Sequence, residues 1–302
     1  MSQGSHARAV VVGGRGFIGS HLVEALSASG TPVTVLGRDD PPVIDGSAHP
    51  SLMSARTVYW AASSINPLIA SEHPELVAAD RRSFERFLHA LETAGAACRV
   101  VLLSSGGTVY GRAPTPHRET TPPAPDSAYG FAKLDLEQLL AERRPDSVSA
   151  RISNAYGPGQ RATSGQGVVA HWLQAVVDQH EVAVYGRATT TRDYVYVSDV
   201  ADALNALHSA PTAPSVLNIG SGRPTTLDEL AAVVDEAVTP RTLRTRIHPA
   251  RPFDIPASWL DVSLAHRTLG WSARTTLRDG VRRTWQHVTG LRDRAQLRTT
   301  IT

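Results

Sequence analysis

Ala9-Val-Val-Val-Gly-Gly-Arg-Gly-Phe-Ile-Gly19 is the most informative stretch of this 302-residue sequence. Its first four residues form a short apolar run typical of a buried parallel strand, and the residues that follow have the apolar spacing of a helix. Glycine at such a turn permits a tight bend and lets backbone N–H groups approach a pyrophosphate at the positive end of the helix. The stretch therefore predicts a dinucleotide site that includes Gly13, Gly16, Phe17, Ile18 and Gly19.

The next predicted strand, Val33–Leu36, ends where a carboxylate usually contacts the ribose of NAD. Gly37 and Arg38 occupy that place here, and Asp39 is the first acid. A missing carboxylate and an added guanidinium leave room for a 2′-phosphate, so we expect NADP(H) rather than NAD(H) as the cofactor. The alternative is that Arg38 stacks on the adenine or faces solvent.

Strands and helices continue to alternate along the chain. Arg56–Ala62 is predicted to be a strand that ends in the small residues Ala61 and Ala62, where a cofactor could lie close. Cys98–Leu103 is predicted to be another strand, and it leads into Ser104 and the polar, glycine-containing residues that follow. This order predicts an α/β fold of the Rossmann type, with a doubly wound parallel sheet whose ligands lie at the carboxyl ends of the strands.

A predicted helix that begins near Ser127 carries Tyr129 and Lys133, which lie one turn apart on the same face. The apolar face of this helix consists of Leu134, Leu136, Leu139 and Leu140. An ammonium one turn away favours the phenolate form of a tyrosine. A tyrosine in this setting can donate or accept a proton at a substrate hydroxyl or carbonyl. Such pairs are also common on half-exposed helices, so the neighbouring motifs decide their meaning.

The composition argues against several other classes of protein. Lys and Arg number 30 against 28 Asp and Glu, a net charge of +2, which is not the basic surface expected of a nucleic-acid-binding protein. No apolar run approaches the roughly 20 residues that a membrane helix needs. The single cysteine, Cys98, excludes an internal disulfide and suits a reducing compartment. We expect a cytoplasmic protein without a metal, a nucleic-acid partner or a membrane partner.

Taken together, the motifs resemble those of the extended short-chain dehydrogenase/reductase family, in the branch of nucleotide-sugar epimerases, dehydratases and ketoreductases. The resemblance extends from about Arg8 to His287. Besides the motifs above, the following stretches carry it: Ser104–Gly111, Arg151-Ile-Ser-Asn-Ala-Tyr-Gly-Pro158, Arg192-Asp-Tyr-Val-Tyr-Val-Ser-Asp199, Asn218-Ile-Gly-Ser-Gly222, Arg251 and Leu269-Gly-Trp271. It implies a dinucleotide-binding domain of residues 8–158, to which 192–210 return, and a smaller substrate domain of 159–191 and 211–290. The charged and polar residues 291–302 are expected to form a frayed tail.

The resemblance also implies roles for single residues. Tyr129 would be the acid/base at the sugar oxygen, and Lys133 would hold the nicotinamide ribose. The stretch from Ser104 to Thr108 would contact the reacting sugar oxygen and the cofactor. The substrate, a nucleotide sugar, would be held by Asn154, Tyr156, Arg192 and Arg251, the two arginines pairing with its diphosphate. Relatives often form homodimers, and the helices predicted at Ser71–Ala94 and Ser127–Arg143 could form the contact.

Two further features depart from the family pattern. Many relatives have Ser or Thr where Gly106 aligns, so Thr108, or else Ser105 or a water, must supply the missing hydroxyl. The segment from Arg38 to Arg56 is short, and the usual strand with an adenine-contacting aspartate is eroded, with Asp45 as its remnant. A weaker grip on adenine suggests a cofactor that exchanges between turnovers.

These observations predict an NAD(P)H-dependent reductase of a nucleotide-activated 4-keto-6-deoxyhexose, with Tyr129 as the acid. The alternative is a 4-epimerase with bound NAD, because the Ser104–Gly111 stretch resembles epimerases equally well. A 4,6-dehydratase is less expected, since the Asp-Glu pair of that branch is replaced by Gly107 and Thr108. A catalytically silent nucleotide-binding protein is the remaining alternative. Gly106 favours it, whereas the intact pair of Tyr129 and Lys133 opposes it.

Overall fold

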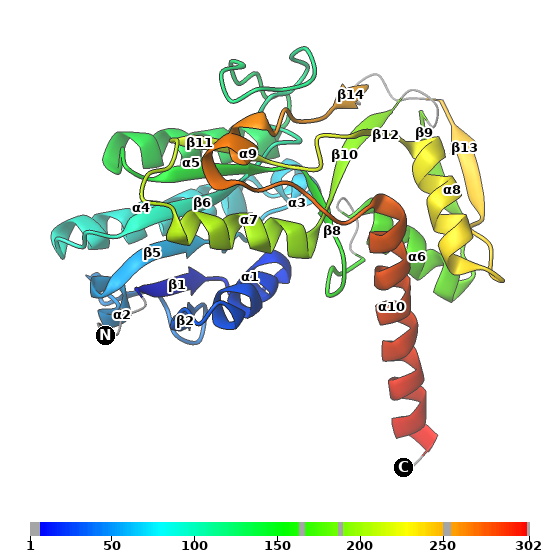
Figure 1. The fold of residues 1–302 in the computed structure, drawn as a ribbon, viewed down its shortest axis with the longest axis horizontal. Coiled ribbons are helices and arrows are strands. Elements are labelled where there is room, and N and C mark those ends of the chain that lie inside the picture. Colours follow the sequence, from blue (N-terminus) through cyan, green and yellow to red (C-terminus); the bar gives the residue numbers. More distant parts are fainter. Residues whose placement is uncertain (1–6, 163–166, 187–189, 250–254, 301–302) are drawn as a thin grey trace.

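The computed structural model describes residues 7–162, 167–186, 190–249 and 255–300, with side chains as far as residue 290. Within these residues a sheet of six parallel strands has the order β11-β7-β6-β5-β1-β2 (Figure 1). The strands are β1 (Arg8–Val12), β2 (Val33–Leu36), β5 (Ala55–Trp60), β6 (Arg99–Ser105), β7 (Val148–Ile152) and β11 (Val216–Ile219). The predicted doubly wound Rossmann-type sheet is confirmed.

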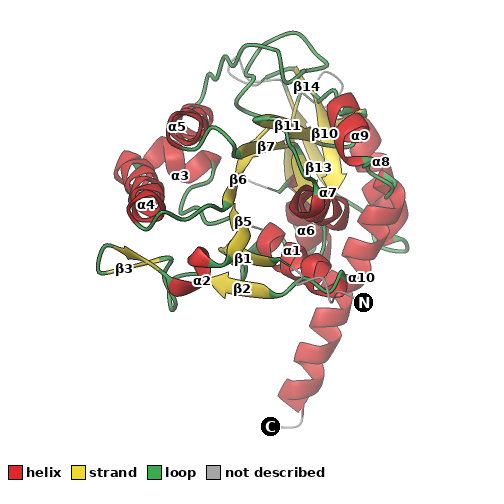
Figure 2. Cartoon of the chain, turned by 60° about the vertical axis from the view of Figure 1, so that its left-hand side comes forward, coloured by secondary structure: helices red, strands yellow, loops and turns green. Residues whose placement is uncertain are grey.

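Helices cover both faces of this sheet (Figure 2). One face is covered by α1 (Phe17–Ala28), α7 (Val197–Ser209) and α9 (Ser263–Leu269), and the other by α3 (Pro67–Glu72), α4 (Pro74–Thr93) and α5 (Ala128–Arg143). The sequence predicted one helix from Ser71 to Ala94, but the helix breaks at His73. Pro74 begins the second helix there, because proline suits the first helical turn and not its interior.

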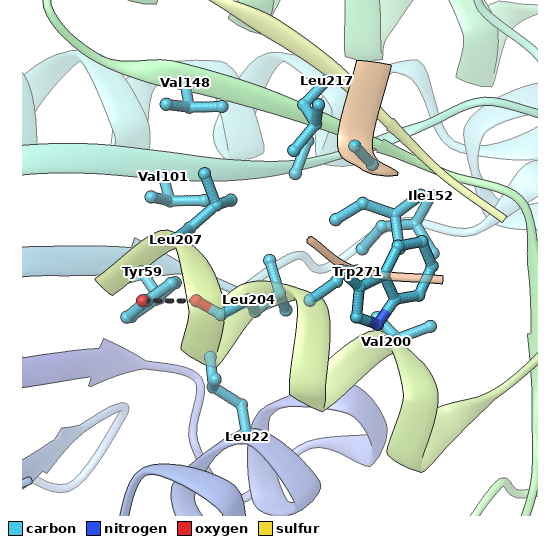
Figure 3. Close-up of a cluster of buried hydrophobic side chains, with 14 of the residues drawn as sticks. Leu22, Tyr59, Val101, Val148, Ile152, Val200, Leu204, Leu207, Leu217 and Trp271 are labelled. Carbon is cyan, nitrogen blue, oxygen red and sulfur yellow. Dashed lines mark hydrogen bonds between the residues drawn. The ribbon is translucent and has the colours of Figure 1, made fainter. Parts of the chain in front are cut away.

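Each face of the sheet buries its own apolar cluster. Beneath α1 and α7 lie Leu22, Leu204, Leu207 and Trp271, and the Tyr59 hydroxyl donates to the carbonyl of Leu204 at 2.8 Å (Figure 3). Beneath α4 and α5 the residues are mostly aromatic or leucine: Trp60, Phe84, Phe87, Leu88, Leu91, Leu136, Leu139 and Leu140. Burial of each such side chain contributes about 1.5–3 kcal/mol, so these clusters hold the helices onto the sheet.

A smaller region extends from the carboxyl side of this sheet. Its strands are β8 (Asn154–Tyr156), β9 (Val182–Tyr185), β10 (Thr191–Tyr196), β12 (Pro224–Thr226), β13 (Thr245–His248) and β14 (Ala257–Ser258), and its helices are α6 (Val168–Asp178), α8 (Leu227–Val238) and α10 (Leu277–Thr300). A third apolar cluster, centred on Trp172, Leu173 and Val234, joins them. Thr226 and Glu229 form the capping box expected at the start of α8.

The predicted domain boundaries need two corrections. Residues 211–290 were assigned to the substrate domain, but β11 pairs with β7 in the main sheet, and Trp271 packs against the same face. The indole of Trp271 donates to the carbonyl of Asp199 at 3.0 Å, which fixes this return of the chain. The tail was expected to fray from residue 291, whereas α10 continues to Thr300.

The short segment after β2 adds no strand to the main sheet, as expected from its eroded sequence. Among the described residues the sheet ends at β2, and the segment forms the hairpin β3 (Val43–Ile44) and β4 (Ser47–Ala48), followed by α2 (Pro50–Met53). Asp45 lies exposed in the hairpin turn with a φ of 49°, next to Gly46. The side of the fold expected to hold the adenine is therefore reduced to a small hairpin.

Candidate active site

The glycine-rich turn between β1 and α1 forms a cradle for a diphosphate. Gly13 has a φ of +86°, and a Cβ there would lie 2.7 Å from the backbone nitrogen of Ala62. A Cβ on Gly19 would overlap the carbonyl oxygen of Gly13, so α1 packs against the turn only with glycine at both positions. Gly16 precedes the helix, and no described side chain caps it. The first backbone N–H groups of α1, which include those of Phe17 and Ile18, fit the phosphates of a dinucleotide.

At the end of β2 the structure leaves open space where a ribose-binding carboxylate is missing. A Cβ on Gly37 would meet no heavy atom of the described residues within 4 Å, and Arg38 is exposed beside it. Arg15, from the glycine-rich turn, pairs with Asp39 at 2.5 Å, so a second guanidinium lies at the same edge. The open space and the exposed Arg38 fit a ribose that carries a 2′-phosphate, whereas the charge of Arg15 is balanced by Asp39.

Ala61 and Ala62 follow β5 and lie against the glycine-rich turn. The backbone N–H of Ala61 donates to the carbonyl of Val12 at 2.9 Å, which continues the pairing of the two strands. The next residues are held by a carboxylate that sequence reasoning missed. Asp80 on α4 is buried and accepts hydrogen bonds from the Ser64 backbone at 2.8 Å and from the Ser63 hydroxyl at 3.2 Å. Asp80 thus fixes the backbone that directly follows Ala61 and Ala62.

Helix α5 delivers Tyr129 and Lys133 to the carboxyl ends of β5 and β6. Ser127 caps the helix by accepting from the Gly130 N–H at 3.1 Å. The Lys133 ammonium lies 5.5 Å from the centre of the Tyr129 ring. Lys133 is only 5 % exposed, and its ammonium lies 3.5 Å from the hydroxyl of Ser63. Tyr129 is half-buried. The predicted pair therefore borders the segment that follows β5.

The hydroxyls of Thr108 and Ser105 form one unit next to this helix. Thr108 Oγ1 donates to Ser105 Oγ at 2.9 Å, which leaves the Ser105 proton free for another acceptor. A Cβ on Gly130 would lie 2.7 Å from the Thr108 carbonyl oxygen, so the first turn of α5 packs directly on Thr108. This close approach brings Tyr129 to the same end of the sheet as the two hydroxyls. Sequence reasoning did not identify Gly130.

Two positions in the stretch from Ser104 to Thr108, Gly106 and Ser104, lie against buried neighbours. A Cβ on Gly106 would lie 2.7 Å from Leu260 Cδ1 and 3.1 Å from the Arg151 carbonyl oxygen. The place of the missing hydroxyl is thus filled by a leucine. Ser104, predicted to contact the cofactor, is 6 % exposed, and its hydroxyl donates to Glu137 at 2.5 Å. Its side chain belongs to a buried network behind the site.

The structure separates the predicted substrate residues. Asn154 lies beside the active-site loop, because a Cβ on Gly107 would be 3.9 Å from its side-chain amide. Arg192 is half-buried on β10, and its guanidinium donates to the Thr191 carbonyl at 2.9 Å. Arg251 lies outside the described residues. Tyr156 is placed wrongly by the prediction.

Tyr156 lies in the core of the smaller region and not in the site. It is 2 % exposed and contacts Tyr196 edge-on, with the ring centres 5.6 Å apart. Its hydroxyl points at the start of α10, 3.4 Å from the Leu277 carbonyl, and burial raises its pKa. Strand β8 pairs in parallel with β10, and this pairing places Tyr156 next to Tyr196 in the third apolar cluster.

Asp193 is a second buried carboxylate near the candidate site that sequence reasoning missed. Its carboxylate is fully buried, and burial raises its pKa. It accepts hydrogen bonds from the Ser221 hydroxyl at 2.6 Å, the Ser221 N–H at 2.8 Å and the Leu260 N–H at 3.3 Å. Its backbone carbonyl accepts from Asn154 at 3.0 Å. Asp193 thereby holds Asn154 and Leu260, the leucine beside Gly106, in one arrangement. Its place directly after Arg192 in a motif was the available signal.

The described part of the chain offers neither a metal site nor a membrane-spanning helix. No group of three or more His, Cys, Asp or Glu side chains there is arranged to hold a metal ion. None of the helices there is both long and apolar enough to cross a bilayer.

Comparison with known proteins adds three relatives. A UDP-glucose 4-epimerase of Mycolicibacterium smegmatis is 31% identical over 309 residues, which cover 92% of this chain and 97% of that enzyme. A dTDP-6-deoxy-L-talose 4-dehydrogenase (NAD(P)(+)) of Kitasatospora kifunensis is 30% identical over 304 residues, which cover 92% of this chain and 95% of that enzyme. The structure of Thermus thermophilus UDP-glucose 4-epimerase with NAD matches 94% of this chain and 99% of that one, with a TM-score of 0.79 and 30% identity.

The sequence also matches a family model over residues 9–220, which contain the glycine-rich turn, Tyr129, Lys133 and most of the main sheet. The match confirms the resemblance on which the roles of these residues were predicted. The chain belongs to the NAD dependent epimerase/dehydratase family.

Proposed function

We propose that this protein is an NADPH-dependent reductase of a nucleotide-linked 4-keto-6-deoxyhexose. The observation that carries the proposal is the edge of β2, where Gly37 leaves open space and the exposed Arg38 supplies positive charge, whereas the charge of Arg15 is balanced by Asp39. A dissociable NADPH suits a reductase, which must exchange its cofactor in every turnover. The 30% identical 4-dehydrogenase from Kitasatospora kifunensis, which acts on a dTDP-linked 6-deoxyhexose, supports the substrate class.

In this reaction Tyr129 is the acid. When bound, the reduced nicotinamide supplies the hydride. Tyr129 protonates the oxygen that becomes the alcohol, and Lys133, one turn further along α5, balances the charge left on the phenol. The Ser105 hydroxyl, which accepts from Thr108, is free to donate to the same substrate oxygen and polarise the carbonyl. Asn154 and Arg192 bind the nucleotide part of the substrate, with Arg192 at its diphosphate.

A 4-epimerase with tightly held NAD is the second candidate. The 31% identical epimerase matches nearly its whole length, and the similar Thermus thermophilus structure contains NAD. In that reaction Tyr129 takes the proton of the sugar hydroxyl and later returns it. A homodimer formed through α4 and α5 and a cytoplasmic location both stay predictions.

The first experiment is to denature the purified protein and identify any released nicotinamide cofactor by chromatography and absorbance. We expect no stoichiometric NAD, tighter binding of NADPH than of NADH, and oxidation of NADPH by a nucleotide-linked 4-keto-6-deoxyhexose. Stoichiometric bound NAD, with exchange of 4-epimers and no NADPH oxidation, would refute the reductase and support the epimerase.

The role of Tyr129 is tested by Tyr129→Phe, which removes only the hydroxyl. We expect a loss of kcat of about 10²–10⁴-fold, the usual contribution of a positioned acid, with NADPH affinity changed less than about threefold. Isothermal titration measures the affinity, and absorbance at the nicotinamide band measures turnover. An unchanged kcat would remove Tyr129 from the mechanism.

A further inference from the structure

A buried ion pair joins α5 to the main sheet two turns beyond Tyr129. Glu137 and Arg151 have side chains that are 5% and 4% exposed. Arg151 Nη2 donates to Glu137 Oε2 at 2.6 Å, and its Nε lies 3.1 Å from both carboxylate oxygens. The Ser104 hydroxyl donates to Glu137 Oε1 at 2.5 Å. Because Tyr129, Lys133 and Glu137 are spaced four residues apart, they lie along one stripe of α5.

The other side of the pair reaches the active-site loop. The Arg151 guanidinium lies 4.6 Å from the centre of the Tyr110 ring, and Tyr110 is two residues beyond Thr108. The Tyr110 hydroxyl donates to Asn218 on β11 at 2.8 Å. Burial opposes the charge on Arg151, but the contact with Glu137 outweighs it and raises the pKa of the guanidinium. The network therefore spans from the helix of Tyr129 to both ends of the segment that holds Ser105 and Thr108.

Stability alone does not explain a charged pair at this place. Buried ion pairs can often be replaced by apolar side chains without loss of stability, because desolvation offsets their attraction. Helix α5 already has apolar anchors in Leu136, Leu139 and Leu140. Apolar contacts are non-directional, whereas charge-assisted hydrogen bonds fix distance and angle. The pair is thus suited to fixing the position of α5 along the sheet and the rotation of α5 about its own axis.

We propose that Glu137 is a positioning residue, which through Arg151 and Ser104 sets the placement of Tyr129 relative to the hydroxyls of Ser105 and Thr108. This inference rests on the proposed role of Tyr129 as the acid. Loss of Glu137 would destabilise the fold, because Arg151 would stay buried without its partner, and in the molecules that fold it would move the phenol away from the substrate oxygen. A displacement of about 1 Å in such a site can lower the rate about 100-fold.

The test compares Glu137→Gln with Asp135→Asn, a matched control on the same helix. Asp135 accepts from Arg81 at 2.8 Å in a solvent-exposed ion pair that joins α5 to α4. Glu137→Gln is expected to lower kcat about 100-fold while KM and the NADPH Kd change less than threefold. Asp135→Asn is expected to stay within twofold of the native kcat. All rates are taken well below the melting temperature of each variant.

A purely structural role predicts a different result, namely a lower melting temperature of Glu137→Gln with a kcat within twofold of the native value. That outcome would overturn the inference. If Glu137→Gln does not fold, Ser104→Ala decides the matter, because it removes only one hydrogen bond to the carboxylate; we expect about a tenfold lower kcat, and an unchanged kcat overturns the inference. If the native enzyme interconverts 4-epimers and reduces no keto sugar, only the proposed reductase activity is refuted. The kcat values of the native protein and the variants are then compared in the epimerisation reaction.

Discussion

The contact between Gly106 and Leu260 predicts a strong coupling between two substitutions. Leu260 is 1% exposed, its N–H donates to Asp193, and its Cδ1 would lie 2.7 Å from a Cβ on Gly106. The Arg151 carbonyl oxygen, at 3.1 Å from the same Cβ, is backbone and cannot turn away. The backbone of Gly106 is not in the left-handed region, so alanine meets no conformational strain there.

The cost of each change follows from these contacts. Gly106→Ala overpacks the site, which typically costs about 1–3 kcal/mol, offset by about 0.4–1 kcal/mol from the lower entropy of the unfolded chain. Leu260→Ala removes a buried side chain and should cost about 2–5 kcal/mol. In the double variant the new methyl occupies part of the space that Leu260 vacates. We therefore expect the double variant to be more stable than the sum of the single changes by about 1–3 kcal/mol.

Urea denaturation of the protein without ligands measures the four free energies of unfolding. Additivity within about 0.5 kcal/mol would refute the contact and with it the explanation of the missing hydroxyl. Gly290→Ala is the control, because a Cβ there meets no heavy atom of the described residues within 4 Å. In this helical position the change should stabilise the protein by up to about 1 kcal/mol.

Two further predictions concern the cofactor and pH. Arg38→Ala should weaken NADPH binding about tenfold and leave NADH binding within about twofold, as measured by titration calorimetry, since one charge-assisted contact contributes about 1.5 kcal/mol; equal losses for both cofactors would contradict a role at the 2′-phosphate. Burial lowers the pKa of His117 and His208 below the ordinary 6.5, so the unfolded chain binds more protons below that pH. Their contribution to stability is complete above pH 6.5 and falls on acidification, by at most about 1.4 kcal/mol per pH unit for each residue. Melting temperatures from pH 7.5 to 5.5 should fall less in His208→Leu than in the native protein, and an identical pH dependence would contradict this.

Features that depend on a few neighbouring residues were predictable from the sequence. The turn at Gly13 and Gly19 requires glycine because a strand, a helix and a neighbouring backbone meet there, and that requirement is visible in the spacing alone. Tyr129 and Lys133 are four residues apart on a helix, so their shared face follows from helical geometry. The same holds for the capping box of Thr226 and Glu229. The last two are decided within about ten residues of chain, whereas Gly13 also depends on the close approach of Ala62.

Features that depend on distant residues were not predictable in the same way. The short apolar run of β11 gives no sign that it pairs with β7 and not with strands of the smaller region. Tyr156 lies in a motif whose residues were expected to bind the substrate. Only the packing of α10 against it shows that its hydroxyl is enclosed. Ser104 likewise lies at the end of a strand at the ligand edge, but its hydroxyl donates a hydrogen bond to Glu137, 33 residues later.

Gly106 shows how the two kinds of information combine. From the sequence alone, a missing hydroxyl in a catalytic stretch favours a protein that has lost its activity. The structure gives the gap a different meaning, because Leu260 fills it and Asp193 holds Leu260 in place. Two residues away, Thr108 donates to Ser105, so the Ser105 hydroxyl can donate to another acceptor. The intact pair of Tyr129 and Lys133 and the family match over residues 9–220 favour an enzyme over a silent binding protein, and the filled space at Gly106 does not weigh against activity.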